Sequence, residues 1–280
     1  MVKMAATVSL STSPFLFNYR GAGETAGRCG YDAIEAVAVR GVKRVSDLQY
    51  VRSLGLDVTV HLPVASRRSR DLDFSRRYIQ RPAYGEIENC RLLDFARDFH
   101  VPCVVHASTL KSMGDAQVSH VLDGLWLRIE NEAGEGAIEQ QLRVFDNLVS
   151  RNSSGMNLGL TVDIGHAMIE KHVAASGICD FADWLIRQYD GYPVEEVHAS
   201  RVFGGGSNKL VDHGLWPSGS EHFLGQVARF VGQVNAQTVV FEFYPNHLTA
   251  VQLNFGRQLE WFESRANYAA KIMKAALARD

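Results

Sequence analysis

Short apolar runs rich in β-branched residues alternate along the chain with longer stretches that mix apolar and polar positions. Runs such as Val58-Thr59-Val60 and Val239-Val240-Phe241 are nearly continuous in their apolar character, which is typical of strands buried on both faces. The pattern predicts eight strands, over residues 6–11, 33–39, 57–62, 103–107, 125–131, 158–164, 195–199 and 238–243.

The longer stretches between these runs are amphipathic and predict helices. The expected helices cover residues 46–54, 86–99, 135–150, 180–188 and 221–234, and a final helix covers about 251–278. The first and fourth connections are short or irregular as helices, so no helix is assigned to them.

Eight strands joined by helical crossovers over 280 residues predict an α/β protein, a single (β/α)8 TIM barrel that spans residues 1–280 as one domain. The alternative is a doubly wound open sheet, which usually carries a glycine-rich phosphate turn after an early strand, and no such turn is present. The run Gly204-Gly205-Gly206 follows the seventh predicted strand and lacks the Gly-Lys-Ser/Thr of a P-loop. We interpret it as a flexible active-site loop that binds no nucleotide.

Composition restricts the possible partners of the chain. With 29 Lys and Arg against 31 Asp and Glu, the net charge of −2 argues against a broadly basic nucleic-acid-binding surface. No apolar stretch approaches the ~18 residues of a membrane span, and the first ten residues fit a strand better than a signal peptide. Four cysteines without a Cys-x-x-Cys pair (Cys29, Cys90, Cys103 and Cys179) indicate reduced thiols. We therefore expect a cytoplasmic protein whose oligomeric state is open, a homo-oligomer included.

Six successive predicted strands end in a side chain that can bind a metal ion. These residues are His61, His106, Glu130, Asp163, His198 and Glu242. A single polar residue there would mark only the point where a strand meets water. Six in a row differ, because buried charges are costly unless they are paired or metal-bound, and all carboxyl ends of a barrel converge on one bowl. Imidazoles and carboxylates together suit zinc, manganese, iron or cobalt. Because six groups exceed what one tetrahedral ion accepts, we expect two or more ions.

Two further histidines extend this set. His166 lies three residues after Asp163, where the chain is expected to turn back over the bowl, and His213 lies in a stretch predicted as a loop without strand character. The remaining histidines have no such context and are expected to be ordinary; they are His100, His120, His172, His222 and His247.

Four short segments carry a resemblance to a known superfamily. They are Ile-Glu-Asn-Glu-Ala-Gly at 129–134, Val-Asp-Ile-Gly-His-Ala at 162–167, Val-His at 197–198 and Phe-Glu at 241–242. In their order and spacing the chain resembles the xylose-isomerase-like barrels, which include sugar-phosphate isomerases and epimerases and endonuclease IV. The resemblance implies one central metal held by Glu130, Asp163, His198 and Glu242. In the epimerase branch it also implies that Glu130 and Glu242 act as a paired acid and base.

Other residues are similar to the multi-metal members of that superfamily. His61 and His106 resemble the additional first-metal ligands of endonuclease IV, which Glu130 would bridge, and His166 and His213 resemble its third-metal ligands. The remaining third-metal ligand would be an aspartate two residues before the loop histidine, where this chain has Val211. This departure favours two ions over three. The segment 210–214 is also loosely similar to barrels with several iron ions that oxidise peptide cysteines.

These features leave several functions open. The first is a small-molecule isomerase or epimerase acting on a sugar or sugar-phosphate-like substrate, in which Glu130 and Glu242 exchange a proton with a carbon next to a metal-polarised carbonyl. His166 would be a third catalytic residue, and Arg201 and Lys209 would bind the substrate. Iron-dependent oxidation at the same ligands is a further alternative, and a barrel kept only as a scaffold is disfavoured by the nearly intact ligand set.

Phosphodiester hydrolysis, as in endonuclease IV, is the main alternative and uses a metal-bound hydroxide. It requires a rim that holds DNA, and a single short basic cluster is the only candidate for it: Arg67, Arg68, Arg70, Arg76, Arg77 and Arg81. Because the chain is mildly acidic and this cluster is short, we expect a small-molecule substrate, with neither a nucleic acid nor a membrane as partner.

Overall fold

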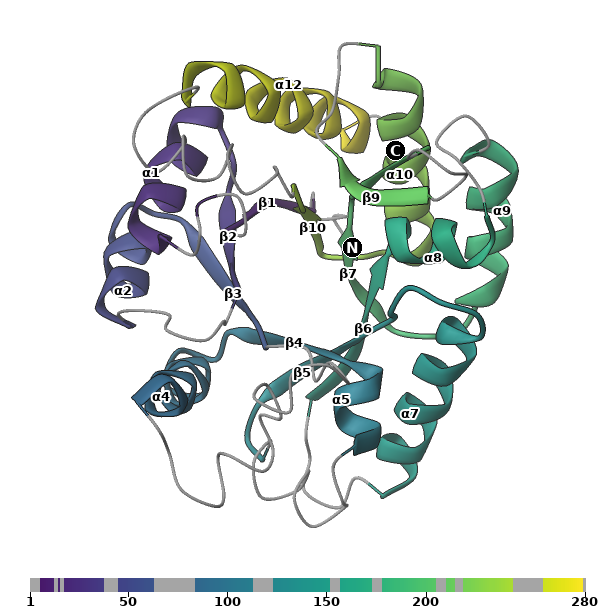
Figure 1. Ribbon diagram of the computed structural model, residues 1–280, viewed down its shortest axis with the longest axis horizontal. Coiled ribbons are helices and arrows are strands. Elements are labelled where there is room, and N and C mark those ends of the chain that lie inside the picture. The colour runs from purple at the N-terminus through teal and green to yellow at the C-terminus, as the bar shows by residue number, and fades with distance from the viewer. Residues whose placement is uncertain are drawn as a thin grey trace.

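Eight parallel strands close into a barrel in a computed structural model of the chain, and helices surround it (Figure 1). Around the ring the strands follow chain order, and the last one pairs with the first. They are β1 (Thr7–Ser11), β2 (Ala33–Val37), β3 (Asp57–His61), β4 (Pro102–His106), β5 (Trp126–Glu130), β6 (Asn157–Asp163), β7 (Val194–His198) and β10 (Thr238–Phe241). The prediction of a (β/α)8 barrel is confirmed.

The structure describes residues 6–12, 15, 18–37, 45–62, 84–112, 123–151, 157–172, 178–204, 210–214, 219–243 and 259–278, with the backbone alone at 84–91, 112, 203–204 and 210–214. Within these ranges the helices are α1 (Tyr19–Cys29), α2 (Val45–Ser53), α4 (Tyr84–Phe99), α5 (Ala107–Ser112), α7 (Ala137–Arg151), α8 (Ile164–Glu170), α9 (Ile178–Gln188), α10 (Glu221–Val234) and α12 (Leu259–Leu277). None of them is long and apolar enough to cross a membrane. Three of the cysteines are described as free thiols, with Cys29 and Cys103 buried and Cys179 exposed.

Helix α1 occupies the first connection, where no helix was predicted. Its three glycines lower helix propensity by about 1 kcal/mol each, so local preference argues against the helix. Packing on α2 overrides that preference. A Cβ atom on Gly23 would lie 2.6 Å from Cγ2 of Val51, so only glycine lets the two helices approach this closely. The helix begins where the Asn18 side chain accepts a hydrogen bond from the Gly21 amide, and it ends at Gly30 in the left-handed conformation (φ 77°).

A two-stranded antiparallel sheet stands apart from the barrel and packs against α8. It pairs β8 (Arg201–Gly204) with β9 (Leu210–Gly214). Here the prediction was wrong, because the stretch around His213 forms a strand and Gly204 ends its partner strand rather than opening a loop. The signal was weak because each strand is short and its pairing depends on the opposite one. Gly205 and Gly206 lie outside the described residues.

The register of the barrel strands decides which polar residues become neighbours. His106 pairs with Glu130 across β4 and β5, and Asp163 pairs with His198 across β6 and β7. Alternate residues of a strand point to the same face, so Arg128 shares the inward face of Glu130, and Glu196 shares that of His198. The interior of this barrel is therefore charged at its centre, whereas barrels of this kind usually fill that layer with branched apolar side chains.

Candidate metal centre

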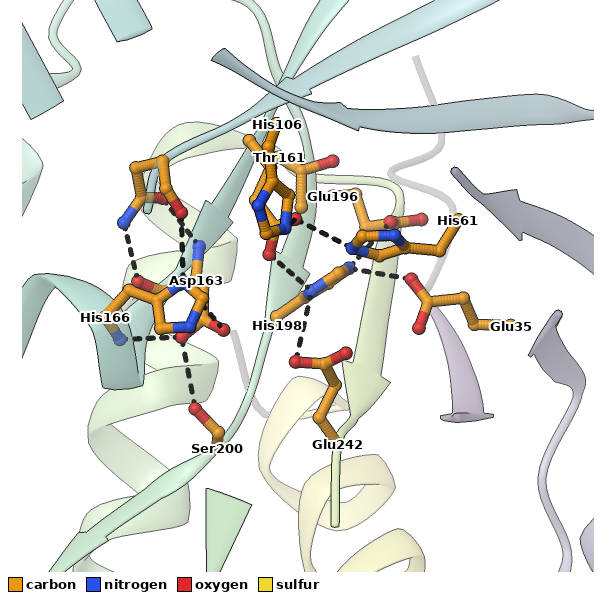
Figure 2. Close-up of polar contacts among 12 residues, drawn as sticks. Glu35, His61, His106, Thr161, Asp163, His166, Glu196, His198, Ser200 and Glu242 are labelled. Carbon is orange, nitrogen blue, oxygen red and sulfur yellow. Dashed lines mark hydrogen bonds and ion pairs between the residues drawn. The ribbon is translucent and has the colours of Figure 1, made fainter. Parts of the chain in front are cut away.

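All six side chains predicted at strand ends meet at the carboxyl end of the barrel. Each of the first five is the last residue of its strand, and Glu242 follows β10 directly. All six are buried. In Figure 2 the side chains of His61, His106, His198 and Glu242 point toward one another. A closed parallel barrel produces this convergence, because every strand ends at the same rim.

Glu130 lies at the centre of this group and faces it with both carboxylate oxygens. Its Oε2 atom is 2.8 Å from Nε2 of His61 and 2.7 Å from Nε2 of His106. Its Oε1 atom is 3.0 Å from Nδ1 of His198. One oxygen thus faces β3 and β4, and the other faces β7.

The potential ligand atoms form three overlapping groups, in each of which all atoms lie within 4.8 Å of one another. One group contains His61, His106 and Glu130, and a second contains Glu130, Asp163, His198 and Glu242. These two groups share only Glu130. The third group adds Glu35, which was not predicted, to His61, His198 and Glu242.

Unsatisfied polar atoms at the centre fit a divalent cation. The Nδ1 atom of His198 is buried without a hydrogen bond, although it lies 3.0 Å from Oε1 of Glu130 and 3.6 Å from Oε2 of Glu242. Both carboxylate oxygens of Glu35 are also buried without a hydrogen bond. Buried polar atoms of native proteins nearly always have a partner. An ion bound at about 2.0–2.2 Å would satisfy several of them at once, and donors of this kind suit zinc, manganese, iron or cobalt.

Without a bound ion, the carboxylates of the centre keep the neighbouring histidines protonated, and these protons balance the negative charge. Burial lowers the pKa of His106, but the Glu130 and Glu132 carboxylates together outweigh burial and raise that pKa to about 9. Burial would raise the pKa of Glu130, but His106, His198 and His61 together hold it well below its usual range. A cation that binds here therefore replaces protons, and metal binding should release them to solvent.

Neighbouring groups fix the orientation of two of the histidine rings. Nδ1 of His61 donates to the carbonyl oxygen of Leu62 at 2.8 Å. Nδ1 of His106 lies 3.4 Å from Oε1 of Glu132, which also accepts a 2.5 Å hydrogen bond from the Ser108 hydroxyl. Both rings therefore present Nε2 to Glu130, as metal-ligating histidines do when a second partner holds the other nitrogen.

His166 lies beside the centre but belongs to none of the three groups. It does not sit in a simple turn; it lies in the first turn of α8, where its amide donates at 2.8 Å to the carboxylate of Asp163, the residue that caps the helix. Its Nδ1 atom is 3.0 Å from the Asn131 carbonyl oxygen, which orients the ring. The Asn131 side chain bonds both the amide and the carbonyl of Asp163, which ties β5 to β6 at the rim.

The remaining predicted site residues lie on or near the β8–β9 sheet or outside the described residues. The backbone of His213 is part of β9, and its side chain is not described. Arg201 begins β8 and is half-buried. Lys209 and the basic cluster at 67–81 lie outside the described residues, as do His120 and His247.

Comparison with known proteins relates the barrel to solved structures at low sequence identity. A structure of L-ribulose 3-epimerase has a TM-score of 0.58 and 14% identity and covers 98% of this chain and 95% of its own. Endonuclease IV from Thermus thermophilus has a TM-score of 0.56 and 17% identity, over 98% of this chain and all of its own (100%). A D-tagatose 3-epimerase-like protein has a TM-score of 0.54 and 16% identity, over 94% and 99%.

The chain has the fold of the xylose-isomerase-like barrels. At such identities the likeness concerns the fold, and the resemblance noted in the sequence is confirmed at that level. No protein-family model and no curated protein sequence matches the chain. Because this fold occurs both in proteins named as epimerases and in one named as an endonuclease, the reaction has to be argued from the site itself.

Proposed function

We propose that the protein is a divalent-metal-dependent enzyme of the isomerase or epimerase type that acts on a small hydroxy-carbonyl compound. The observation that carries this proposal is the placement of Glu130 and Glu242 on either side of Nδ1 of His198, at 3.0 and 3.6 Å. Two carboxylates beside one ligand atom can hold an ion and exchange a proton with the compound bound to it. Two of the structures with this fold are named as 3-epimerases or as similar to one, which agrees with that chemistry.

The contacts of the two carboxylates divide their roles. Glu130 faces His61 and His106 with one oxygen and His198 with the other, so both of its oxygens point at ligand atoms and it would serve mainly as the bridge. We assign to Glu242 the removal of the proton from the carbon next to the carbonyl and, once the double bond has shifted, the return of a proton to the substrate, which restores the carboxylate. The bound ion would polarise the carbonyl and hydroxyl oxygens of the substrate. Nε2 of His166, together with Arg201 and Lys209, would contact the substrate's oxygens or phosphate.

The test is deuterium uptake from D2O into a panel of ketoses, inososes and their phosphates by protein loaded with Mn²⁺ or Co²⁺. Glu242→Gln keeps an oxygen that can bind the ion but cannot accept the proton, so we expect uptake to fall by about 10²–10⁴-fold with metal binding largely kept. Glu139→Gln, on the exposed face of α7, is the matched control and should leave uptake unchanged. Equal uptake by the Glu242→Gln variant would refute the assignment.

Phosphodiester hydrolysis is the second candidate, and the group of His61, His106 and Glu130 favours it. This group supplies ligands for a second ion beside the first, and pairs of ions typically activate water and stabilise phosphate charge. Endonuclease IV has the same fold. Cleavage of abasic DNA that is lost in His106→Ala, with no deuterium uptake by any substrate, would replace the first proposal. Inactivity in both assays, together with two or three iron ions in the purified protein, would favour iron-dependent oxidation.

A further inference from the structure

Arg128 is a buried cation in the barrel interior that the proposed chemistry does not use. Only 2% of the residue is exposed, and it lies on β5 two residues before Glu130. A buried guanidinium is costly unless its hydrogen bonds are made, so its partners indicate why the chain places it there.

Several contacts hold the guanidinium in one position. Its Nη1 group donates to Oε2 of Glu196 at 2.5 Å, and its Nε group donates to Oε2 of Glu195 at 3.2 Å. The same Glu195 oxygen accepts a hydrogen bond from Nε1 of Trp126 at 2.6 Å, and the guanidinium lies over the Trp126 ring at 5.0 Å. Arg128 is therefore fixed from both the β7 side and its own strand.

Glu196 connects Arg128 to the metal centre, because it contacts both Arg128 and His198. Its Oε2 atom accepts from Arg128, and its Oε1 atom lies 3.0 Å from Nε2 of His198 (Figure 2). A histidine that donates from Nε2 has only Nδ1 left to bind an ion. Nδ1 of His198 is the buried atom that faces both Glu130 and Glu242. Glu35 also approaches Nε2, at 3.1 Å, but its carboxylate makes no hydrogen bond that would hold it in place.

We propose that Arg128 and Glu196 are positioning residues that fix the His198 ring with Nε2–H toward Glu196 and Nδ1 toward the ion. This inference rests on the proposed function only in requiring that an ion binds there. Mutation of the carboxylate partner of a metal-ligating histidine typically weakens metal binding by about 10–100-fold. Here the carboxylate is itself buried and depends on Arg128, so loss of the arginine should have an effect of the same size.

A cavity on the opposite face of the barrel makes the proposal testable by chemical rescue. It has a volume of about 270 Å³ and is lined by Arg128 and by Thr7, Asp57, Trp126 and Thr238, each the first residue of its strand. It therefore opens at the amino ends of the strands, away from the metal centre. In Arg128→Ala, a guanidinium ion from solution can enter through this cavity and occupy the place of the missing side chain.

The experiment measures Zn²⁺ affinity of the full chain by competition with a chelator. Arg128→Ala should bind Zn²⁺ roughly 10–100-fold more weakly than wild type. A few millimolar guanidinium chloride should restore most of the loss, and tetramethylammonium chloride should restore none. Arg229→Ala removes an exposed arginine whose partner is Asp183 and should change neither affinity nor its response to guanidinium. Should Arg128→Ala fail to fold, Arg128→Lys and Glu196→Gln test the same contacts and should each lose a smaller part of the affinity.

Long-range ¹H–¹⁵N spectra of the histidine side chains provide a readout that a merely structural role would not change. With or without Zn²⁺, His198 should show a downfield, slowly exchanging Nε2–H resonance that disappears in Arg128→Ala and returns with guanidinium. Absence of Zn²⁺ binding by wild type would refute the proposed function. The Nε2–H resonance would still show whether Arg128 and Glu196 fix the His198 ring. A folded Arg128→Ala variant with wild-type affinity and an unchanged resonance would overturn the inference.

Discussion

The contact between α1 and α2 gives a stability prediction whose size follows from one distance. A Cβ atom on Gly23 would lie 2.6 Å from Cγ2 and 3.2 Å from Cγ1 of Val51, whereas ordinary contacts of this kind are 3.4–4 Å. Gly23→Ala gains about 1 kcal/mol of helix propensity but forces the buried Val51 side chain or the helix to move. Overpacking of this kind typically costs about 1–3 kcal/mol.

Gly27→Ala is the matched control, because it makes the same change in the same helix at an exposed position with nothing within 4 Å of the new methyl group. It should raise the free energy of unfolding by about 1 kcal/mol. The propensity gain cancels between the two variants, so Gly23→Ala should be less stable than Gly27→Ala by about 1–3 kcal/mol.

Urea unfolding followed by circular dichroism measures this difference. In a Val51→Ala background the obstructing methyl groups are gone, and the difference between the two glycine substitutions should shrink toward zero. If Gly23→Ala proved as stable as Gly27→Ala in the wild-type background, the close helix contact would not explain why the chain keeps glycine there.

Three further predictions concern the metal centre and the buried thiols. His106→Ala should lower the ion content of Zn²⁺-loaded protein from two per chain to one, measured by elemental analysis, and an unchanged content would argue against the Glu130 bridge. Ser108→Ala removes the hydrogen bond that holds Glu132 beside His106, so binding of one ion should weaken about tenfold in a chelator competition. Equal affinity would show that Glu132 does not orient His106. Burial raises the pKa of Cys103 from 9.0 to about 12, so the folded state keeps this proton and stability should fall as the pH rises above 9. Between pH 8 and 10 wild type should lose about 1.4 kcal/mol more than Cys103→Ala in urea unfolding, and equal losses would contradict the assignment.

The barrel could be predicted because its signal is local and repeated. Each strand is a short apolar run, six of the eight runs end in a polar residue, and the structure moves their predicted limits by only a few residues. Helix α1 could not be predicted in this way, because its glycines disfavour a helix and the contact that explains Gly23 is made by Val51, which lies in another helix. The β8–β9 sheet also depends on pairing between two short segments, and the glycine run between them resembled a loop.

The polar residues at strand ends predict the rim of the centre, whereas the layer below the rim has no such signal. Glu35, Glu196 and Arg128 lie within strands, where a charged residue breaks an apolar run without ending it. The alternation of strand side chains provides the missing signal, because Glu196 lies two residues before His198 and Arg128 lies two residues before Glu130. A charge two positions before a strand-end ligand therefore indicates a group on the same face of the strand, in the layer below the centre.

The order of the ligand groups along the chain has a consequence for how the protein matures. His61, His106 and Glu130 lie on the neighbouring strands β3, β4 and β5, so this group is complete before the second half of the chain leaves the ribosome. The other group needs Asp163, His198 and finally Glu242, which follows the strand that pairs with β1 and closes the ring. Because β10 also pairs with β7, where His198 lies, all four ligands of that second group would come together only after the last barrel strand has joined the sheet, and an ion held by all four would mark a chain whose sheet is complete.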